Sequence, residues 1–257
     1  MVRRRKKSPI FEVFKDYILS SDEIKKTALV KTLGDHANDQ EYIKSNFSKL
    51  VTDTEKKAYE IFLISQNESA PIAISEYLAD KLPETFTKNE LLQSINTYFE
   101  DIDSFFLSLS QSRKARAGYS FQYTINELFH QLDYPFDEQP IINGQPDFLF
   151  PNKEYYLKNS IDCIIFTVKR VIRERWRQIT NEGTRGMGFY LATIDDKITE
   201  LELPRIKDNK INLVVPKEIK EKVPHYRDAD HVLTFESFIL DKLDPAVKAW
   251  KRRGIIS

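Results

Sequence analysis

The sequence predicts an α/β protein in which a mixed central sheet is flanked by helices and preceded by an all-helical N-terminal domain. Three observations lead to this prediction. Apolar residues recur at helical spacing through the first hundred or so residues, glycine is nearly absent there, and beyond about residue 130 short apolar runs alternate with helical segments. We therefore expect a helical domain at residues 1–109 and an α/β domain at residues 110–257.

The N-terminal domain is expected to consist of amphipathic helices. Phe11, Phe14 and Ile18 lie on one face of a first helix. A later helix starts at the capping pattern of Thr52 and Glu55, and residues 87–111 form a long amphipathic segment. Residues 112–132 are expected to add one more helix that opens on a basic turn.

The strands are expected in the second domain. Residues 135–144 and 146–151 are typical of a hairpin or of paired strands, because Asn143-Gly144 is a turn signal. Residues 160–169, 188–195 and 211–219 are apolar strand candidates, residues 171–181 return to helical spacing, residues 197–209 indicate a helix or a turn, and the tail from residue 233 to 254 is helical.

Composition limits the classes of function. Lys and Arg together number 39, as do Asp and Glu, so the global charge predicts no nucleic-acid partner. The single Cys163 excludes an intramolecular disulfide and a multi-cysteine zinc site. Apolar runs are too short for a membrane span, and GxGxxG, GxxxxGK[ST], HExxH and GxSxG motifs are absent. We expect a cytoplasmic protein, in which the basic arm at residues 3–7 is a solubilising tail or a phosphate contact.

Local charge is more informative than the global balance. Five Lys and Arg residues fall within residues 169–177, directly after an apolar run. Such a run is usually a solvated helix face. The alternative is an active-site strand that leads into a DNA-reading helix.

Acids and a lysine near strand ends favour that alternative. Hydrolysis of a phosphodiester needs a divalent cation on oxygen ligands, an attacking water and a positive group near phosphorus. Asp147 and Lys169 can lie on neighbouring strands, and Lys169 shares a strand face with Thr167. Glu182 follows Lys169 by 13 residues, about three helical turns. Taken singly, Asp147 is typical of a turn and Lys169 of a solvated strand end, so the prediction depends on their combination.

Together these residues resemble the PD-(D/E)xK type II restriction endonucleases, in the EcoRII- and NgoMIV-like branch whose sites contain CC and GG. The resemblance covers about residues 110–240 and is carried by Pro146-Asp147, Thr167-Val168-Lys169, Arg173-Glu174-Arg175 and Glu182. It implies a restriction-endonuclease-like core in which Asp147 and Glu182 hold Mg²⁺ and Lys169 orients the attacking water. Thr167 stands where an acid is usual, so the acid is displaced to Glu182.

One departure from the family pattern concerns the second metal position. Relatives usually have a glutamate there, whereas this chain has Gln122. Glu127, further along the same helix, is a substitute candidate, and Gln122 can still act as a neutral ligand of the metal or of its water. A one-metal site and a weakened two-metal site both stay open.

The basic segment also predicts how DNA is read. Arg173, Glu174 and Arg175 fan out at about 100° steps near a helix N-terminus. Arginine pairs with O6 and N7 of guanine, and glutamate accepts from N4 of cytosine, as a GG:CC half-site requires. The residues expected to contact phosphates are Arg113, Lys114, Arg116, Arg170 and Arg177.

The resemblance implies a Mg²⁺-dependent enzyme that cuts double-stranded DNA at a palindrome and leaves 5′ overhangs. A palindrome implies a homodimer or a higher oligomer. Whether CC and GG abut or flank a central base stays open, as does the role of the N-terminal domain in clamping DNA, dimerisation or effector binding. The rival classes are a structure-selective or repair nuclease of the same fold and a non-catalytic DNA-binding regulator.

Overall fold

The computed structural model describes residues 8–142, 144–172 and 188–256. The chain divides into two compact units, the first made of residues up to 31 with 55–120, and the second of residues 32–54 with 121–257. Two long helices, α4 (Phe47–Ala79) and α5 (Lys88–Gln131), run from one unit into the other. The domain limit expected at residue 110 falls within α5 and stays a prediction.

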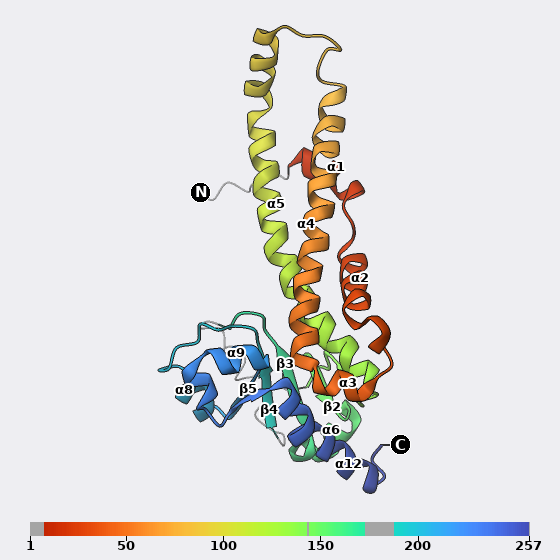
Figure 1. The fold of residues 1–257 in the computed structure, drawn as a ribbon, viewed down its shortest axis with the longest axis vertical. Helices are drawn as coiled ribbons and strands as arrows, with labels where there is room; N and C mark the ends of the chain where they lie inside the picture. The colour runs from red at the N-terminus through yellow and green to blue at the C-terminus, as the bar shows by residue number, and fades with distance from the viewer. Residues whose placement is uncertain (1–7, 143, 173–187, 257) are drawn as a thin grey trace. The chain divides into compact units, whose positions relative to one another are not determined.

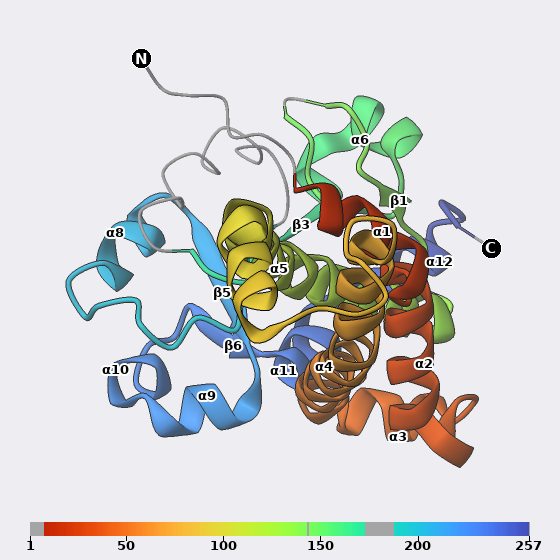
Figure 2. The same ribbon diagram turned by 90° about the horizontal axis from the view of Figure 1, so that it is seen from above.

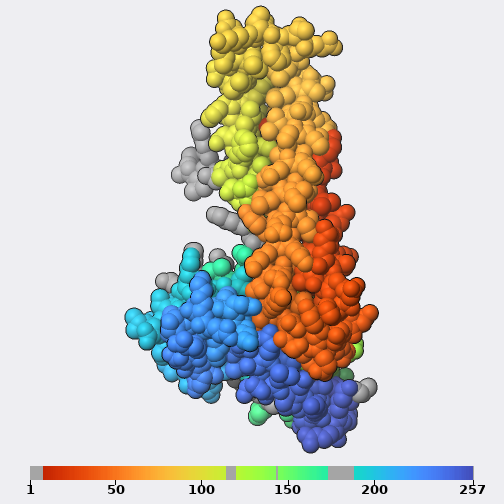
Figure 3. All heavy atoms as spheres, viewed as in Figure 1, coloured from red at the N-terminus to blue at the C-terminus, as the bar shows by residue number. Residues whose placement is uncertain are grey.

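The first unit is helical. It contains α1 (Pro9–Tyr17), most of α2 (Ser21–Leu33) and the adjoining parts of α4 and α5. The Ser8 side chain accepts the Phe11 N–H and so caps α1. Figures 1 and 3 show α4 and α5 side by side along this unit, with side chains filling the space between them. The core is formed by Ile10, Phe14, Ile18, Ile24, Ala28, Ala58, Phe62, Ala73, Phe105 and Leu109.

Helix α5 corrects one expectation. Residues 87–132 were expected to form two helices with a break at the basic turn near residue 112, but residues 88–131 form one helix of 44 residues. The segment contains no proline and no glycine before Gly118, so no residue in it breaks the helix. Lysine, arginine and alanine at residues 113–117 are good helix formers, and their charge does not end the helix.

The second unit is built on a mixed sheet, as predicted. In the part of the chain that the structure describes, six strands follow one another in sequence order. β1, β2 and β3 pair antiparallel, and β3, β4, β5 and β6 pair parallel. The strands are β1 (Asp137–Glu138), β2 (Phe148–Phe150), β3 (Ile164–Val168), β4 (Gly188–Ala192), β5 (Ile211–Val215) and β6 (Val232–Thr234).

Helices cover both faces of this sheet. On one face Ile165, Leu191 and Leu213 belong to a core with side chains of α8 (Leu203–Asp208) and α10 (Pro224–Arg227). On the other face Phe166 packs against Phe129 of α5 and against α11 (Phe235–Phe238). Figure 2 shows α8, α9 and α10 on one side of β5 and β6, with α11 on the other. Successive residues of β3 therefore point into two different cores, which the period of two requires.

Short helices complete the second unit, and three features of this unit revise the expectations. The strand expected at 160–169 begins as the 3₁₀ turn η2, the strand expected at 211–219 gives way to helix α9, and the tail expected to be helical from Leu233 begins within β6. The helix expected at 171–181 lies mostly outside the described residues.

No described helix is long and apolar enough to cross a membrane. The remaining elements are η1 (Gly34–His36), α3 (Gln40–Ser45), α6 (Lys153–Asn159), η2 (Ser160–Asp162), α9 (Lys217–Lys222), η4 (Ile239–Leu243) and α12 (Asp244–Arg252).

Candidate active site

Asp147 and Lys169 lie at the same edge of the sheet. Asp147 immediately precedes β2 and Lys169 immediately follows β3. The two strands are antiparallel with Phe148 opposite Phe166, so the start of one adjoins the end of the other. As a result the Lys169 Nζ lies 3.8 Å from Oδ2 of Asp147. The Asp147 side chain is buried, whereas that of Lys169 is partly exposed.

The carboxylate of Asp147 is held in place by its neighbours. Its Oδ2 accepts a hydrogen bond from the Val168 N–H at 2.7 Å and another from the Thr167 hydroxyl at 2.9 Å. The Asp147 carbonyl accepts the Gln139 N–H at 3.0 Å, so the main chain is fixed as well. Thr167 is fully buried, and it acts here as a donor that orients Asp147. This role agrees with the expectation that Thr167 is a strand residue close to the site.

Gln122, and not Glu127, contacts Asp147. The Gln122 Nε2 donates to Oδ1 of Asp147 at 2.9 Å. Glu127 lies five residues further along α5, which turns it by about 140° around the helix axis. In the part of the chain that the structure describes, Glu127 makes no hydrogen bond with Asp147. The Gln122 amide can turn by 180°, which exchanges the positions of its oxygen and nitrogen.

The donor set at this edge fits a hard divalent cation. Oδ1 of Asp147 accepts one hydrogen bond from the described residues, and a carboxylate oxygen can accept two. Turning the Gln122 amide would place a second oxygen beside it, and such oxygens are the ligands that Mg²⁺ prefers. The described residues contain no cluster of three or more His, Cys, Asp or Glu side chains. Glu182, the second carboxylate that the sequence predicts, lies outside the described residues.

The structure describes only some of the other residues that were predicted to act in the site. Arg173, Glu174, Arg175 and Arg177, like Glu182, lie outside the described residues, so their roles stay predictions. Arg170 follows Lys169 and lines a small pocket beyond the ends of β3 and β4.

The predicted phosphate contacts on α5 belong to the first unit. The Arg113 Nε donates to Oε1 of Gln66 at 2.9 Å, and the side chains of Lys114 and Arg116 lie outside the described set. Outside the site, the carboxylate of Asp162 pairs with Arg253.

The mixed sheet, with a buried aspartate and a lysine at the adjoining ends of β2 and β3, defines the class: this is a restriction-endonuclease-like fold. Metal-depleted Ecl18kI in complex with uncleaved, modified DNA has the same fold, with a TM-score of 0.75 and 24% identity over 98% of this chain and 85% of that chain. Residues 83–239, more than half of the chain, match the family described as EcoRII C terminal. The chain belongs to this family.

Two relatives carry the similarity in sequence. The type II restriction enzyme EcoRII of Escherichia coli is 30% identical over 161 residues, which are 59% of this chain and 39% of that enzyme. The type II restriction enzyme SsoII of Shigella sonnei is 25% identical over 227 residues, or 82% of this chain and 73% of that enzyme. The chain thus matches well under half the length of EcoRII and almost three quarters of SsoII.

Sequence reasoning missed two residues beside the site. Thr193 and Asp195 follow β4, and both are buried. They were expected to form the end of a strand at 188–195, but the strand ends at Ala192. A polar Thr-x-Asp directly after an apolar strand was the available signal, because buried polar side chains at such a position require hydrogen-bond partners.

Proposed function

We propose that the chain is a Mg²⁺-dependent type II restriction endonuclease that cuts both strands of DNA at a palindrome containing CC and GG. The observation that carries the proposal is the 3.8 Å approach of Lys169 to Asp147 at the edge of a mixed sheet. Membership of the EcoRII C-terminal family supports it, since EcoRII and SsoII are named type II restriction enzymes.

In this proposal the two sides of the site have separate tasks. Asp147 and Glu182 hold the cation, assisted by the amide oxygen of Gln122 or by Glu127. The chemistry that such an ion supplies is activation of a water molecule and stabilisation of charge on the phosphate. The Lys169 ammonium orients the water and offsets the negative charge that builds up at phosphorus, an electrostatic contribution. Thr167 keeps the Asp147 carboxylate turned towards this edge through the 2.9 Å hydrogen bond.

Specificity is assigned to the segment that follows Lys169. Arg173 and Arg175 would read guanines and Glu174 a cytosine, while Arg170 and Arg177, with the basic residues 113, 114 and 116, contact phosphates. Contiguous reading residues favour CC and GG around a central base, and a continuous CCGG core is the alternative. By the same resemblance, cleavage leaves 5′ overhangs.

A palindromic site also sets the assembly. Two identical half-sites call for a two-fold symmetric homodimer, with a tetramer on DNA as the other arrangement. We place the protein in the cytoplasm of a bacterial or archaeal cell, where it meets double-stranded DNA. The bacterial sources of EcoRII and SsoII support that assignment.

The test is incubation of the protein with Mg²⁺ and a sequenced plasmid, followed by mapping of the product ends. Lys169→Ala and Arg173→Ala serve as the informative variants. Lys158→Ala is a matched control, because Lys158 is an exposed lysine of the same unit that pairs with Glu154 on α6. EDTA in place of Mg²⁺ tests the metal.

Discrete fragments whose ends share CC and GG, present with the control and lost with both informative variants, are the expected result. A cleavage ladder without preferred sites would favour a structure-selective or repair nuclease. An intact plasmid that the protein nevertheless binds would favour a non-catalytic regulator, and the proposal would then be wrong.

A further inference from the structure

Three residues join the proposed catalytic lysine to the proposed reading triplet. Arg170, Val171 and Ile172 lie between Lys169 and Arg173. Ile172 is fully buried, while Val171 is exposed. Because only these three residues separate Lys169 from the proposed reading triplet, the path of the main chain from 170 to 172 limits where the triplet can lie relative to Lys169.

Side chains that follow β4 hold this path. The Lys169 N–H donates to the Ala192 carbonyl at 2.9 Å, which continues the parallel pairing of β3 with β4 by one step. Beyond that step the contacts come from side chains: the Thr193 hydroxyl donates to the Arg170 carbonyl at 3.2 Å. The Ile172 N–H then donates to Oδ2 of Asp195 at 3.0 Å.

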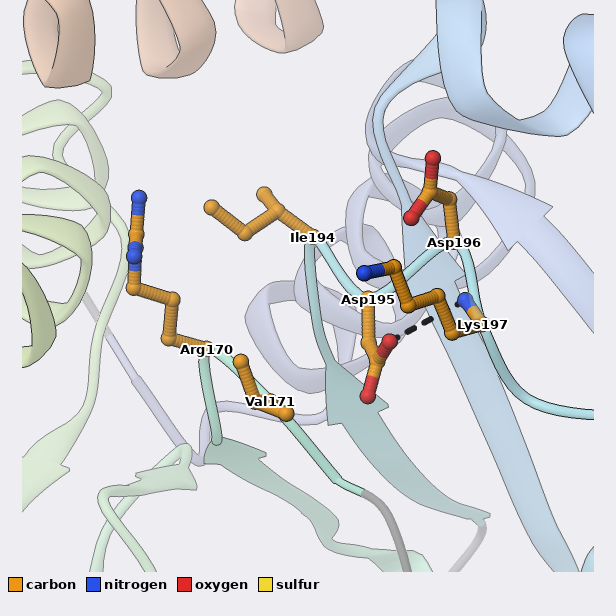
Figure 4. Close-up of a pocket in the computed structure, with 6 residues that line it drawn as sticks. All are labelled: Arg170, Val171, Ile194, Asp195, Asp196 and Lys197. Atoms are coloured by element: carbon orange, nitrogen blue, oxygen red, sulfur yellow. Dashed lines mark hydrogen bonds between the residues drawn. The ribbon is translucent and has the colours of Figure 1, made fainter.

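Asp195 is itself fixed from several directions. Its side chain is buried, and its Oδ1 accepts the Lys197 N–H at 3.0 Å, the dashed line in Figure 4. Its own N–H donates to the Thr193 hydroxyl at 3.1 Å. Its carbonyl accepts from the hydroxyl of Tyr226 at 2.8 Å, a residue of α10 that is fully buried. Burial raises the pKa of Tyr226, which keeps this hydroxyl protonated as a donor.

The two segments form opposite walls of one pocket. Arg170 and Val171 line one side, and residues 194–197 line the other, around a volume of about 220 Å³ (Figure 4). The hydrogen bonds of Thr193 and Asp195 bridge these walls, so they set the separation between the exit of β3 and the exit of β4. Residue 173 follows Ile172 in the chain, so under the proposed function a shift of residues 170–172 would also displace the start of the reading triplet.

We propose that Thr193 and Asp195 are positioning residues for base discrimination, which they support by holding residues 170–172 in register with Lys169. This inference rests on the proposed function. Loss of either contact should reduce the difference in kcat/KM between the cognate site and near-cognate sites. Misplacement by about 1 Å costs a reaction on the order of 100-fold, so a loss of discrimination of about 10- to 100-fold is expected.

The test uses duplexes that carry the plasmid-mapped site, intact or with one G·C pair changed to A·T. Thr193→Val removes the hydroxyl, Thr193→Ser keeps it, and Asp195→Asn replaces one of the two acceptor oxygens with an amide nitrogen. Thr199→Val is the matched control, because its hydroxyl donates to Glu202 in the same unit. The melting temperature of each variant is measured first, and discrimination is compared among folded variants.

We expect Thr193→Val and Asp195→Asn to lose discrimination, and Thr193→Ser and the Thr199→Val control to keep it. A merely structural role would lower stability and leave the ratio of kcat/KM values unchanged. A folded Thr193→Val protein with discrimination within twofold of the unmodified protein would overturn the inference while the proposed function stands. Absence of site-specific cleavage by the unmodified protein would overturn the proposed function, and the inference with it.

Discussion

Two replacements of Asp147, by asparagine and by alanine, distinguish its contribution to the stability of the fold from its contribution to DNA cleavage. In Asp147→Asn the new amide oxygen can take the place of Oδ2 and accept from the Val168 N–H and the Thr167 hydroxyl. The new NH₂ group then faces Gln122, whose amide can turn by 180° and offer its oxygen in place of Nε2. Every hydrogen bond of the carboxylate therefore has a counterpart in the asparagine variant. In Asp147→Ala the Val168 N–H keeps no acceptor at this position.

The expected magnitudes follow from those contacts. An unsatisfied buried N–H costs about 1–3 kcal/mol, and each kcal/mol corresponds to about 2–4 °C in the melting temperature of a domain of this size. Asp147→Ala should therefore melt about 2–12 °C below the unmodified protein. Asp147→Asn should stay within about 1 kcal/mol of the unmodified protein, because no buried donor loses its partner. Both variants should lose cleavage by at least about 100-fold, since neither keeps the carboxylate charge.

Thermal unfolding in EDTA, followed by circular dichroism, measures the first effect, and plasmid cleavage with Mg²⁺ measures the second. Asp162→Asn is a matched control: Asp162 also accepts from neighbouring side chains, but it lies before β3, away from Lys169. That control should cut DNA normally. An asparagine variant as unstable as the alanine variant would refute the exchange at Gln122. An asparagine variant that cuts at the normal rate would refute the role of Asp147.

Three further outcomes follow from single contacts. Gln122→Glu places a second carboxylate against Asp147, and the repulsion raises the pKa of one of the two. Without metal, the stability of the variant relative to the unmodified protein should therefore be lower at pH 8 than at pH 5, and Mg²⁺ should raise the melting temperature of the variant more than that of the unmodified protein. Equal responses of the two proteins would contradict this. Tyr134→Phe removes the 2.6 Å hydrogen bond to Asp244 and should cost about 1–3 kcal/mol in urea unfolding, whereas an unchanged midpoint would exclude a net contribution. Burial raises the pKa of Cys163 to about 12, so iodoacetamide at pH 8 should label this thiol only in denaturant. Rapid labelling of the folded protein, measured by mass spectrometry, would show that the structure around Cys163 opens.

The elements that sequence predicted best are those whose own residues determine them. Ile164, Ile165 and Phe166 are all buried, and a run of this kind is typical of a strand covered on both faces. The pairing of β1 with β2 was predicted from a turn signal between two apolar segments. The position of Asp147 at the sheet edge follows from that pairing, because Asp147 immediately precedes β2. The approach of Asp147 to Lys169 was predictable because two neighbouring strands and a period of two leave few other arrangements.

The errors concern features that depend on distant parts of the chain. β6 has only three residues, and it forms because Val232 pairs with Leu213 of β5, a partner that the local sequence does not reveal. Thr234 ends this strand and caps α11 with its side chain, so the first helix of the tail begins at Phe235, two residues after the expected start at Leu233. The unbroken α5 was missed because a change in charge near residue 112 was interpreted as a helix start, although charge alone does not end a helix.

The identity of residue 167 bears on why the proposed site takes its second acid from outside β3. Thr167 is fully buried, and its hydroxyl donates to Asp147 at 2.9 Å. An acid at 167 would bring two carboxylates into contact without access to water, and one of them would have to take up a proton when no cation separates them. With a threonine there, Asp147 keeps a donor in place of a like charge. In the proposed site the second acid, Glu182, comes from a segment outside β3, and the neutral amide at 122 can serve as donor to Asp147 or as oxygen ligand to a cation.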